Sequence, residues 1–318
     1  MDERSDQRRR GLLAVLGATA TAPLMLSGCA TIFSASKAPG GVHAVDPPRF
    51  EAPTRAEPPR VALVLSGGAV RAFAHLGVLR VLEREGLRPD LIVGSSAGAM
   101  VGAYYASGKS VAEIEAIAAR LNLTTLIDID PVRTLLGGFG LGIAKGERLE
   151  AFLRESLDTP LQALPTRFVA VATDLNTGES VLLNHGDTPR ALRASSAVPG
   201  LHEPVRAGNR MLGDGQIASP LPVAAARRLG ARVVVAVDVV YPPHNASLTN
   251  PLSVLFQTVT ISTWRHLLRE REQADLVVTP VIAPTSDLAL SDRTWLIAAG
   301  EAAAEKMLPA LRVAFKTP

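Results

Sequence analysis

A serine between two glycines is the first feature of this sequence that could do chemistry. Gly94, Ser96 and Gly98 form a Gly-x-Ser-x-Gly pattern that follows the apolar run 91–93 and precedes a helix-like stretch ending near Gly108. On a sharp strand-to-helix turn, the glycines permit close backbone approach and the serine hydroxyl is exposed as a nucleophile. The N-terminus of the following helix faces any negative charge that develops beside the serine. The pattern therefore predicts nucleophilic catalysis at Ser96.

A serine hydroxyl attacks only when a neighbouring base accepts its proton, and the sequence offers two kinds of base. The run Leu212-Gly213-Asp214-Gly215 places a carboxylate in a glycine turn, although an ordinary Asp-Gly turn has the same pattern. Six histidines are also present, none of them in a recognisable catalytic pattern: His43, His75, His185, His202, His244 and His266. The residues alone leave both kinds of base open.

Strands that alternate with helices are expected to position these residues. The apolar run 61–65 is bounded by Pro59 and by the glycine loop that begins at Ser66, and apolar residues then recur at helical spacing from Phe73 until Gly86. Further strands are predicted at 168–173, 180–183, 233–237 and 276–278, and a terminal helix at 294–315. This alternation predicts an α/β fold with a mostly parallel sheet and helices on both faces.

Length and composition agree with a globular enzyme and exclude several other classes. The chain has 318 residues, of which 47% are hydrophobic and 20% charged, so disordered and collagen-like chains are excluded. The formal charge is only +3, and no basic stripe with interleaved aromatic residues occurs, so we expect no nucleic-acid partner. No two histidines lie within four positions, and Asp128-x-Asp130 lacks further ligands, so we expect no metal.

The first residues have the order of an export signal. Polar, arginine-rich residues 1–10 precede an apolar run over 11–26 that is short for a membrane-spanning helix. The run ends in Leu26-Ser27-Gly28-Cys29, which resembles the bacterial lipobox, where cleavage before the cysteine leaves it carrying a diacylglyceryl group. Cys29 is the only cysteine, so no internal disulfide can form, and lipidation gives this thiol a use. A buried apolar helix with an incidental thiol is the alternative.

Five motifs together resemble the patatin-like phospholipase family. The run 65–79, the elbow 94–98 and Asp214-Gly215 occur in the order and setting of that family, and 172–178 and 194–200 also resemble its segments. The similarity spans residues 61 to about 305. It implies a three-layer α/β sandwich and a lipid acyl hydrolase without a cofactor.

The resemblance also implies a role for each candidate residue. Ser96 would be the nucleophile and Asp214 its base, in a Ser/Asp dyad without a catalytic histidine. The oxyanion of the reaction would lie beside Gly67, Gly68 and Ala69, with Arg71 nearby to stabilise it or to bind substrate phosphate.

Three residues depart from the family's usual motifs. Ala69 and Ala72 replace the third and last glycines of the Gly-Gly-Gly-x-Arg-Gly loop, and Gln216 replaces the small last residue of the Asp-Gly-Gly or Asp-Gly-Ala motif. If either glycine position needs positive φ, alanine adds strain on the order of 1 kcal/mol. Residual catalysis then depends on whether the loop still directs its N–H groups correctly.

Three segments follow from these motifs: a lipoprotein signal peptide at 1–28, a lipidated Cys29 with a proline-rich tether at 29–60, and a patatin-like catalytic domain at 61–318. Six prolines lie between Ala30 and Arg60, and such a tether reaches on the order of 30 Å. We expect an exported protein anchored to a membrane, on the periplasmic face of either membrane if the cell is Gram-negative. Membrane lipids would be its substrates. Arg9-Arg10 leaves both the Sec and the twin-arginine export routes open.

Two other functions remain open at this point. One is a carboxylesterase with a Ser/Asp/His triad, for which His75, His185 and His202 are the candidates. The other is a non-catalytic scaffold lipoprotein whose oxyanion loop Ala69 and Ala72 have impaired. Neither the headgroup and acyl chain of the substrate nor the oligomeric state follows from the sequence.

Overall fold

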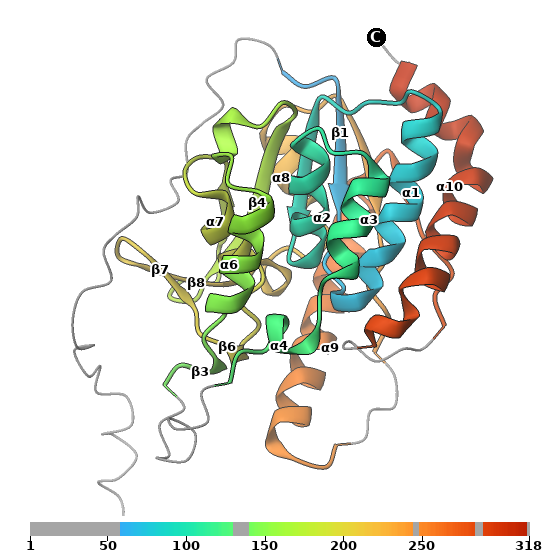
Figure 1. Ribbon diagram of the computed structural model, residues 1–318. Coiled ribbons are helices and arrows are strands. Elements are labelled where there is room, and N and C mark those ends of the chain that lie inside the picture. The colour runs from blue at the N-terminus through green and yellow to red at the C-terminus, as the bar shows by residue number, and fades with distance from the viewer. Residues whose placement is uncertain (1–57, 130–139, 244–247, 284–288, 317–318) are drawn as a thin grey trace, which may run out of the picture. The chain divides into compact units, whose positions relative to one another are not determined.

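The computed structural model describes residues 58–129, 140–243, 248–283 and 289–316, and its central element in that part of the chain is an eight-stranded sheet (Figure 1). The strand order is β10-β9-β1-β2-β4-β8-β7, and β5 pairs with β4 off this path. The strands are β1 Val61–Leu65, β2 Leu91–Ser95, β4 Arg167–Asp174, β5 Ser180–Leu183, β7 Val205–Ala207, β8 Arg210–Asp214, β9 Val233–Val237 and β10 Leu276–Val278. Two further strands, β3 Gly142–Ala144 and β6 Gly200–His202, form a small parallel pair.

The sheet is parallel from β10 to β4 and antiparallel where β5, β8 and β7 join it. All five residues of β1 and of β2 are fully or almost fully buried, which explains why these strands appear in the sequence as continuous apolar runs. The predicted fold class, a mostly parallel sheet covered by helices on both faces, is confirmed.

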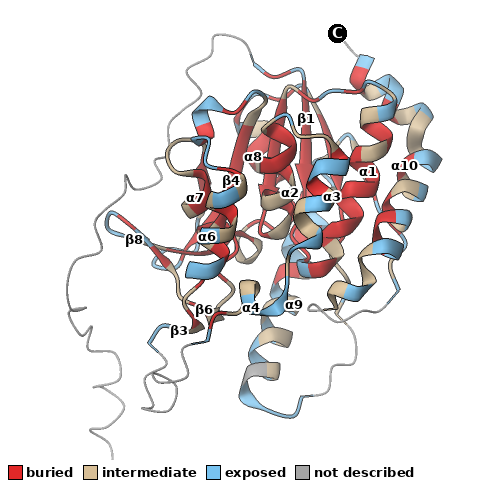
Figure 2. Ribbon diagram, in the orientation of Figure 1, coloured by how far each residue is buried: buried red, intermediate tan, exposed pale blue. Residues whose placement is uncertain are grey.

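Helices cover the two faces of this sheet. One face carries α1 Phe73–Arg84, α2 Ala97–Ala106, α3 Val111–Ala119, α6 Glu147–Ser156, α7 Thr188–Ser195 and α10 Arg293–Lys316, and the other carries α8 Val223–Arg228 and the inner end of α9 Pro251–Arg271. Side chains of β1 alternate between the faces: Val61 and Leu63 pack into the first core and Ala62 and Val64 into the second. Buried residues accordingly concentrate on the strands and on the inner sides of the helices (Figure 2).

The sequence-based ranges agree with these elements. Strands at 180–183, 233–237 and 276–278 have the predicted bounds, and the terminal helix is one residue longer at each end. Ser110 and Glu113 form the capping box expected before α3. The sequence pattern does not predict the short strands β7 and β8. It predicts Asp214 in a glycine turn, whereas the structure has Asp214 as the last residue of β8, directly before that turn.

The predicted signal peptide, Cys29 and the tether up to residue 57 lie outside the described residues. The last tether residues already run beside the sheet, because the carbonyls of Pro59 and Arg60 accept the N–H groups of Arg232 (3.1 Å) and Val233 (2.9 Å). No helix in the described part of the chain is both long and apolar enough to span a bilayer.

Helices α1 and α10 approach each other through two glycines. A Cβ atom at Gly77 would overlap the carbonyl oxygen of Ile297, and one at Gly300 would overlap the carbonyl oxygen of Ala74. Backbone therefore packs directly on backbone at this crossing, and α10 is held against the helix that follows the glycine loop.

We expect Gly77→Ala to lower the free energy of unfolding by roughly 1–3 kcal/mol, because the overlap with Ile297 forces the helices apart. Helix propensity alone predicts the opposite sign, a gain of about 1 kcal/mol. Urea denaturation would measure the difference. Ala302→Gly, at an exposed position of α10, is the control and should cost only about 1 kcal/mol; a Gly77→Ala protein more stable than the parent would refute the close packing.

Candidate active site

Strand β4 aligns the two candidate catalytic residues. Its first half pairs with β2 in parallel and its second half with β8 in antiparallel, so the carboxyl ends of β2 and β8 meet. Ser95, the last residue of β2, is opposite Val171, and Asp214, the last residue of β8, is opposite the next residue, Ala172. The nucleophile candidate, one residue beyond β2, is thereby placed beside the carboxylate that ends β8.

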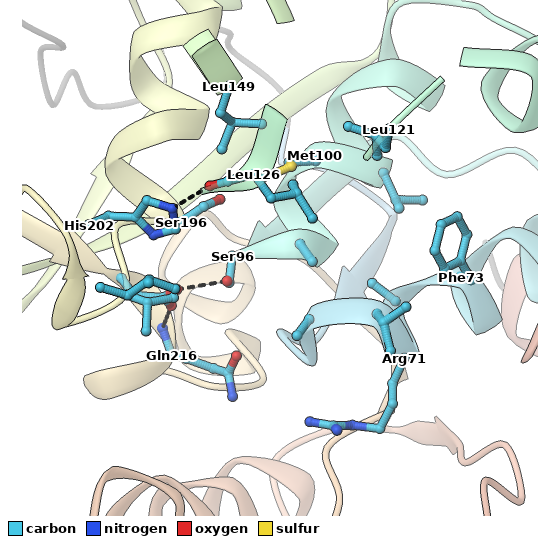
Figure 3. Close-up of a pocket in the computed structure, with 18 of the residues that line it drawn as sticks. Arg71, Phe73, Ser96, Met100, Leu121, Leu126, Leu149, Ser196, His202 and Gln216 are labelled. Carbon is cyan, nitrogen blue, oxygen red and sulfur yellow. Dashed lines mark hydrogen bonds between the residues drawn. The ribbon is translucent and has the colours of Figure 1, made fainter. Parts of the chain in front are cut away.

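The side chains of Ser96 and Asp214 contact each other directly. The Ser96 hydroxyl donates to Oδ2 of Asp214 at 2.7 Å (Figure 3), and the two residues are only 6% and 3% exposed. The other carboxylate oxygen accepts the N–H of Gln216 at 2.8 Å, and the Asp214 carbonyl accepts the Thr173 hydroxyl at 2.7 Å. The carboxylate is thus fixed on both oxygens and on its backbone.

Burial raises the pKa of Asp214 to about 6, because removal from water disfavours the charged carboxylate. The N–H of Gln216 and the hydroxyl of Ser96 act in the opposite direction, since both donate to the ionised form. A carboxylate with this pKa is ionised at neutral pH and is a stronger proton acceptor than an exposed aspartate.

The backbone of Ser96 has the strained geometry of a nucleophile elbow. Its φ is 53° and its ψ is −128°, and its N–H donates to Oγ of Ser195 at 3.0 Å. A Cβ at Gly94 would lie 2.5 Å from the Cα of Ala99, and one at Gly98 would overlap the carbonyl of Ser66. Both glycines of the motif are therefore required by the close packing of strand, turn and helix.

Ser195 supports this elbow, a role that sequence reasoning did not assign. Its hydroxyl accepts the N–H of Ser96 and donates to the carbonyl of Val171 at 2.6 Å, which links the elbow to β4. The segment 194–200 was recognised as a motif, but only the fold shows that its second residue reaches across to Ser96.

The glycine loop after β1 lies beside the serine. The N–H of Gly67, predicted as part of the oxyanion group, donates to the carbonyl of Pro220 at 3.0 Å, so this N–H is already used. The N–H groups of Gly68 and Ala69 have no acceptor within the described residues. Ala69 and Arg71 line the same cavity as Ser96, and the Arg71 Nε donates to the carbonyl of Val239 at 3.3 Å.

Ala69 and Ser96 are the only non-glycine residues with positive φ in the part of the chain that the structure describes. Ala69 has a φ of 49°, whereas Ala72 has a φ of −60° in ordinary helical geometry. Of the two alanines, only Ala69 therefore occupies a backbone conformation that favours glycine. Ala69 and Ser96 line the same cavity, and backbone strain of this kind is concentrated at functional sites.

Glu270 of α9 holds the segment that accepts the Gly67 N–H. One carboxylate oxygen accepts the Ser219 hydroxyl and the other accepts the N–H of Leu221 at 2.9 Å, on either side of Pro220. Burial raises the pKa of Glu270 to about 7. Helix α9 thus holds the segment 219–221 through Glu270, and this segment holds the glycine loop through the bond from the Gly67 N–H to the Pro220 carbonyl.

Gln216 fills the space where the family motif has a small residue. Its side chain lies against Gly67, where an added Cβ would overlap the Gln216 amide, and it reaches the cavity wall (Figure 3). The glycine at position 67 and the larger residue at 216 are therefore complementary, and the Asp214 carboxylate keeps its contact with Ser96 beside them.

A cavity of about 530 Å³ opens over Ser96 and Asp214, within the usual size range of ligand sites. Its walls are mainly apolar and come from helices on both sides of the serine, including Met100, Leu149 and Phe256. No group of three His, Cys, Asp or Glu side chains suited to a metal occurs among the residues that the structure places.

The candidate histidines lie in different surroundings. His75 is fully buried, its Nε2 is 2.9 Å from the Ser66 carbonyl, and burial lowers its pKa to about 4. His202 lines the cavity, but its Nε2 is 2.7 Å from the Leu126 carbonyl, and burial lowers its pKa as well. His185 is not among the cavity-lining residues. The carboxylate of Asp214, and none of these rings, is the side-chain partner of Ser96.

Comparison with known proteins extends this description. A family model described as patatin-like phospholipase matches residues 63–227. An uncharacterized NTE family protein of Mycobacterium tuberculosis is 36% identical over 213 residues, which are 66% of this chain and 56% of that protein. The patatin-like phospholipase domain-containing protein 7 of Rattus norvegicus is 30% identical over 188 residues, 56% of this chain and 13% of that protein. The chain thus spans only part of the length of these relatives.

Among solved structures, VipD from Legionella pneumophila matches with a TM-score of 0.49 at 14% identity, covering 80% of this chain and 67% of that one. The full-length ExoU of Pseudomonas aeruginosa, solved with SpcU, matches with a TM-score of 0.44 at 18% identity, over 82% of this chain and 53% of that one.

The opposite conformations of Ala69 and Ala72 predict opposite effects of glycine. Ala69→Gly should raise the free energy of unfolding by about 0.5–1 kcal/mol, because glycine adopts positive φ without the Cβ penalty. Ala72→Gly should lower it by a similar amount, because the residue is helical. Chemical denaturation of both variants checks the pair; stabilisation by Ala72→Gly, or destabilisation by Ala69→Gly, would contradict the loop geometry.

Proposed function

The chain belongs to the patatin-like phospholipase family, and from this premise we propose that it is a serine lipid acyl hydrolase that cleaves phospholipids or lysophospholipids. The observation that carries the proposal is the 2.7 Å contact between the Ser96 hydroxyl and the buried Asp214 carboxylate at an apolar cavity. An apolar cavity of this size fits an acyl chain. With the chain bound in the cavity, the ester carbonyl at the end of the chain would lie beside Ser96.

In the proposed mechanism, Asp214 accepts the Ser96 proton as Oγ attacks the ester carbonyl. The resulting oxyanion is stabilised by the N–H groups of Gly68 and Ala69, which lie at the start of the helical segment that continues into α1. The tetrahedral intermediate collapses, the alcohol leaves with the proton, and an acyl-serine remains. Water, deprotonated by Asp214, then releases the fatty acid and restores the hydroxyl.

Arg71 is proposed to contact the polar part of the substrate. Its side chain lines the cavity and is held by the Val239 carbonyl, so its guanidinium is already oriented beside the glycine loop. A guanidinium fork matches the geometry of a phosphate, which supports a phospholipid as the substrate class over a neutral ester.

The direct contact favours the dyad over a triad with histidine. His75 is committed to the Ser66 carbonyl, and the Nε2 of His202 to the Leu126 carbonyl, whereas Asp214 accepts the serine hydroxyl itself. The loop geometry also disfavours the scaffold alternative. Ala69 adopts a positive φ, and its N–H and that of Gly68 have no acceptor in the described part of the chain, so both can donate to an oxyanion.

Ser96→Ala and Asp214→Asn should each lower kcat/KM for phospholipid and for p-nitrophenyl esters by at least about a thousandfold, because nucleophile or base is lost. In the parent, activity should rise with pH through about 6 as Asp214 ionises. A fluorophosphonate probe should label Ser96. Full turnover by Asp214→Asn would refute the dyad, and loss of turnover in His202→Ala would indicate the triad instead.

Asp214→Asn should also be more stable than the parent at pH 8 and nearly equal to it at pH 4. The pKa of Asp214 rises from 3.8 to about 6 on folding, so the parent loses stability as pH rises through this range, by about 3 kcal/mol at most. An asparagine stays neutral, and its amide can still accept from Gln216 and donate to Ser96. Thermal unfolding at both pH values separates this gain from general misfolding.

We also propose that the protein is exported and tethered to a membrane by a lipidated Cys29. The sequence of charged start, apolar run and Leu26-Ser27-Gly28-Cys29 supports this proposal, as does the presence of no other cysteine in the chain. One acyl chain binds membranes weakly and two or three bind stably, so the modified cysteine would keep the protein at the surface that contains its substrate.

Cys29→Ser should move the protein from the membrane to the soluble fraction of cells and abolish incorporation of labelled palmitate. The control Ser27→Ala leaves the cysteine and should retain both properties. Unchanged fractionation and labelling in Cys29→Ser would end the lipoprotein proposal without affecting the proposed hydrolase.

A further inference from the structure

The first part of α9, Pro251–Ser262, is poorly covered by the rest of the described protein. None of its residues with a described burial is buried, and the first buried residue of the helix is Thr263. Figure 2 shows this part of α9 in pale blue and tan, and Figure 1 shows it running past the sheet at the end opposite to the C-terminus. We call Pro251–Ser262 the outer half of α9.

The outer half carries no charge, which is unusual for a helix surrounded by water. No Asp, Glu, Lys, Arg or His occurs from Leu248 to Trp264. Three of its apolar side chains, Val254, Leu255 and Ile261, are 48%, 40% and 44% exposed. Helix α10, also at the surface, instead carries six charged residues: Arg293, Glu301, Glu305, Lys306, Arg312 and Lys316.

Three of the four hydroxyl groups of this segment donate to backbone carbonyls of α9 or of its N-cap residue. Thr258 donates to the carbonyl of Val254 at 2.8 Å, Thr260 to that of Phe256 at 2.9 Å, and Ser253 to that of Asn250 at 2.7 Å. A hydroxyl with a satisfied donor loses less on leaving water than a free one. These three hydroxyl groups therefore lower the cost of moving the outer half into an apolar medium.

The same segment forms part of the cavity wall. Phe256 and Val259 line the cavity over Ser96, while Val254 and Leu255 are exposed outside it. Helix α4 (Leu123–Leu126) repeats this arrangement, since Leu126 lines the cavity and Leu123 is 48% exposed. The apolar lining thus continues outward onto the surface through two elements.

Basic residues follow directly after the uncharged segment. Arg265 and Arg269, both exposed, come next along α9, and Arg265 lies roughly 6 Å along the helix axis from Ile261. An apolar tip with adjacent cations matches a bilayer containing anionic lipids, where acyl chains lie just beneath the charged headgroups.

We propose that the outer half of α9, together with Leu123, is a lipid-surface docking site that inserts into the headgroup and upper acyl region of an anionic bilayer. This inference rests on the proposed function, because it places the mouth of the acyl cavity against the phase that holds the substrate. It is independent of Cys29, since it assigns contact with lipid to the folded body.

The insertion can be tested with a fluorescent label on the full chain. In a Cys29→Ser background, Leu255→Cys labelled with an NBD dye should show a blue-shifted, several-fold brighter emission when vesicles of phosphatidylcholine and phosphatidylglycerol are added. Brominated acyl chains should quench it. The control Val313→Cys, 69% exposed on α10, should show neither change. Equal responses at both positions, or a response at position 255 to protein concentration without vesicles, which would indicate a second copy, overturn the proposal.

A second measurement separates docking from catalysis. The double variant Val254→Asp/Leu255→Asp should hydrolyse vesicle phospholipid at least about tenfold more slowly than the parent, because two charges must enter the bilayer. Its turnover of soluble p-nitrophenyl butyrate should be unchanged, and Val313→Asp should match the parent in both assays. If the parent hydrolyses neither substrate, the proposed function is wrong, and the label at position 255 still tests docking. If the double variant hydrolyses vesicle phospholipid as fast as the parent, the docking site is refuted.

Discussion

The head-to-head meeting of β2 and β8 on strand β4 is the constraint on which the site depends. Neighbouring residues of β4, Val171 and Ala172, hold the last residues of the two strands, so the serine and the carboxylate are aligned by backbone pairing. Three hydroxyl groups then tie the side chains and the turns to this register: those of Ser195, Thr173 and Ser96 itself. A shift of β8 by one residue would turn Asp214 to the opposite face of the sheet.

Several features of the site lower the free energy of unfolding. Ser96 and Ala69 have positive φ, and Asp214 and Glu270 are carboxylates whose pKa values burial raises. Each of these features costs on the order of one to a few kcal/mol. The surrounding sheet and its two apolar cores must offset this cost, and Ser96 directly follows the buried strand β2.

The parts of the molecule that the sequence predicts are those set by local pattern. Apolar runs identified the buried strands, helical spacing identified α1 and α10, and the spacing of Gly94, Ser96 and Gly98 identified the elbow. Short antiparallel strands have weaker patterns, so β7 and β8 were missed although β8 carries Asp214. The pairing of Asp214 with Ser96 rests on the family resemblance, because a separation of 118 positions in the sequence does not show that two side chains meet in space.

Other features depend on contacts that no local pattern records. The use of the Gly67 N–H by Pro220 follows from the hydrogen bonds of Glu270 to residues on either side of that proline. Glu270 is 51 positions from Ser219 and lies in a charged stretch of α9 that resembles a solvated surface. Its burial becomes evident only when the inner half of α9 packs beneath the sheet.

The use of aspartate as the direct partner of serine connects the chemistry to the apolar surroundings. An exposed carboxylate is a poor base because water stabilises its charge, and burial removes that stabilisation. Asp214 is only 3% exposed, and the cavity beside it has mainly apolar walls, which suit an acyl chain and would bind a polar substrate poorly. Such a cavity is filled most easily from an apolar phase, since an acyl chain that first enters water pays for its full hydration. In the proposed function, the buried carboxylate, the apolar cavity and the uncharged outer half of α9 would all serve one requirement, that water be kept from the serine while a lipid reaches it.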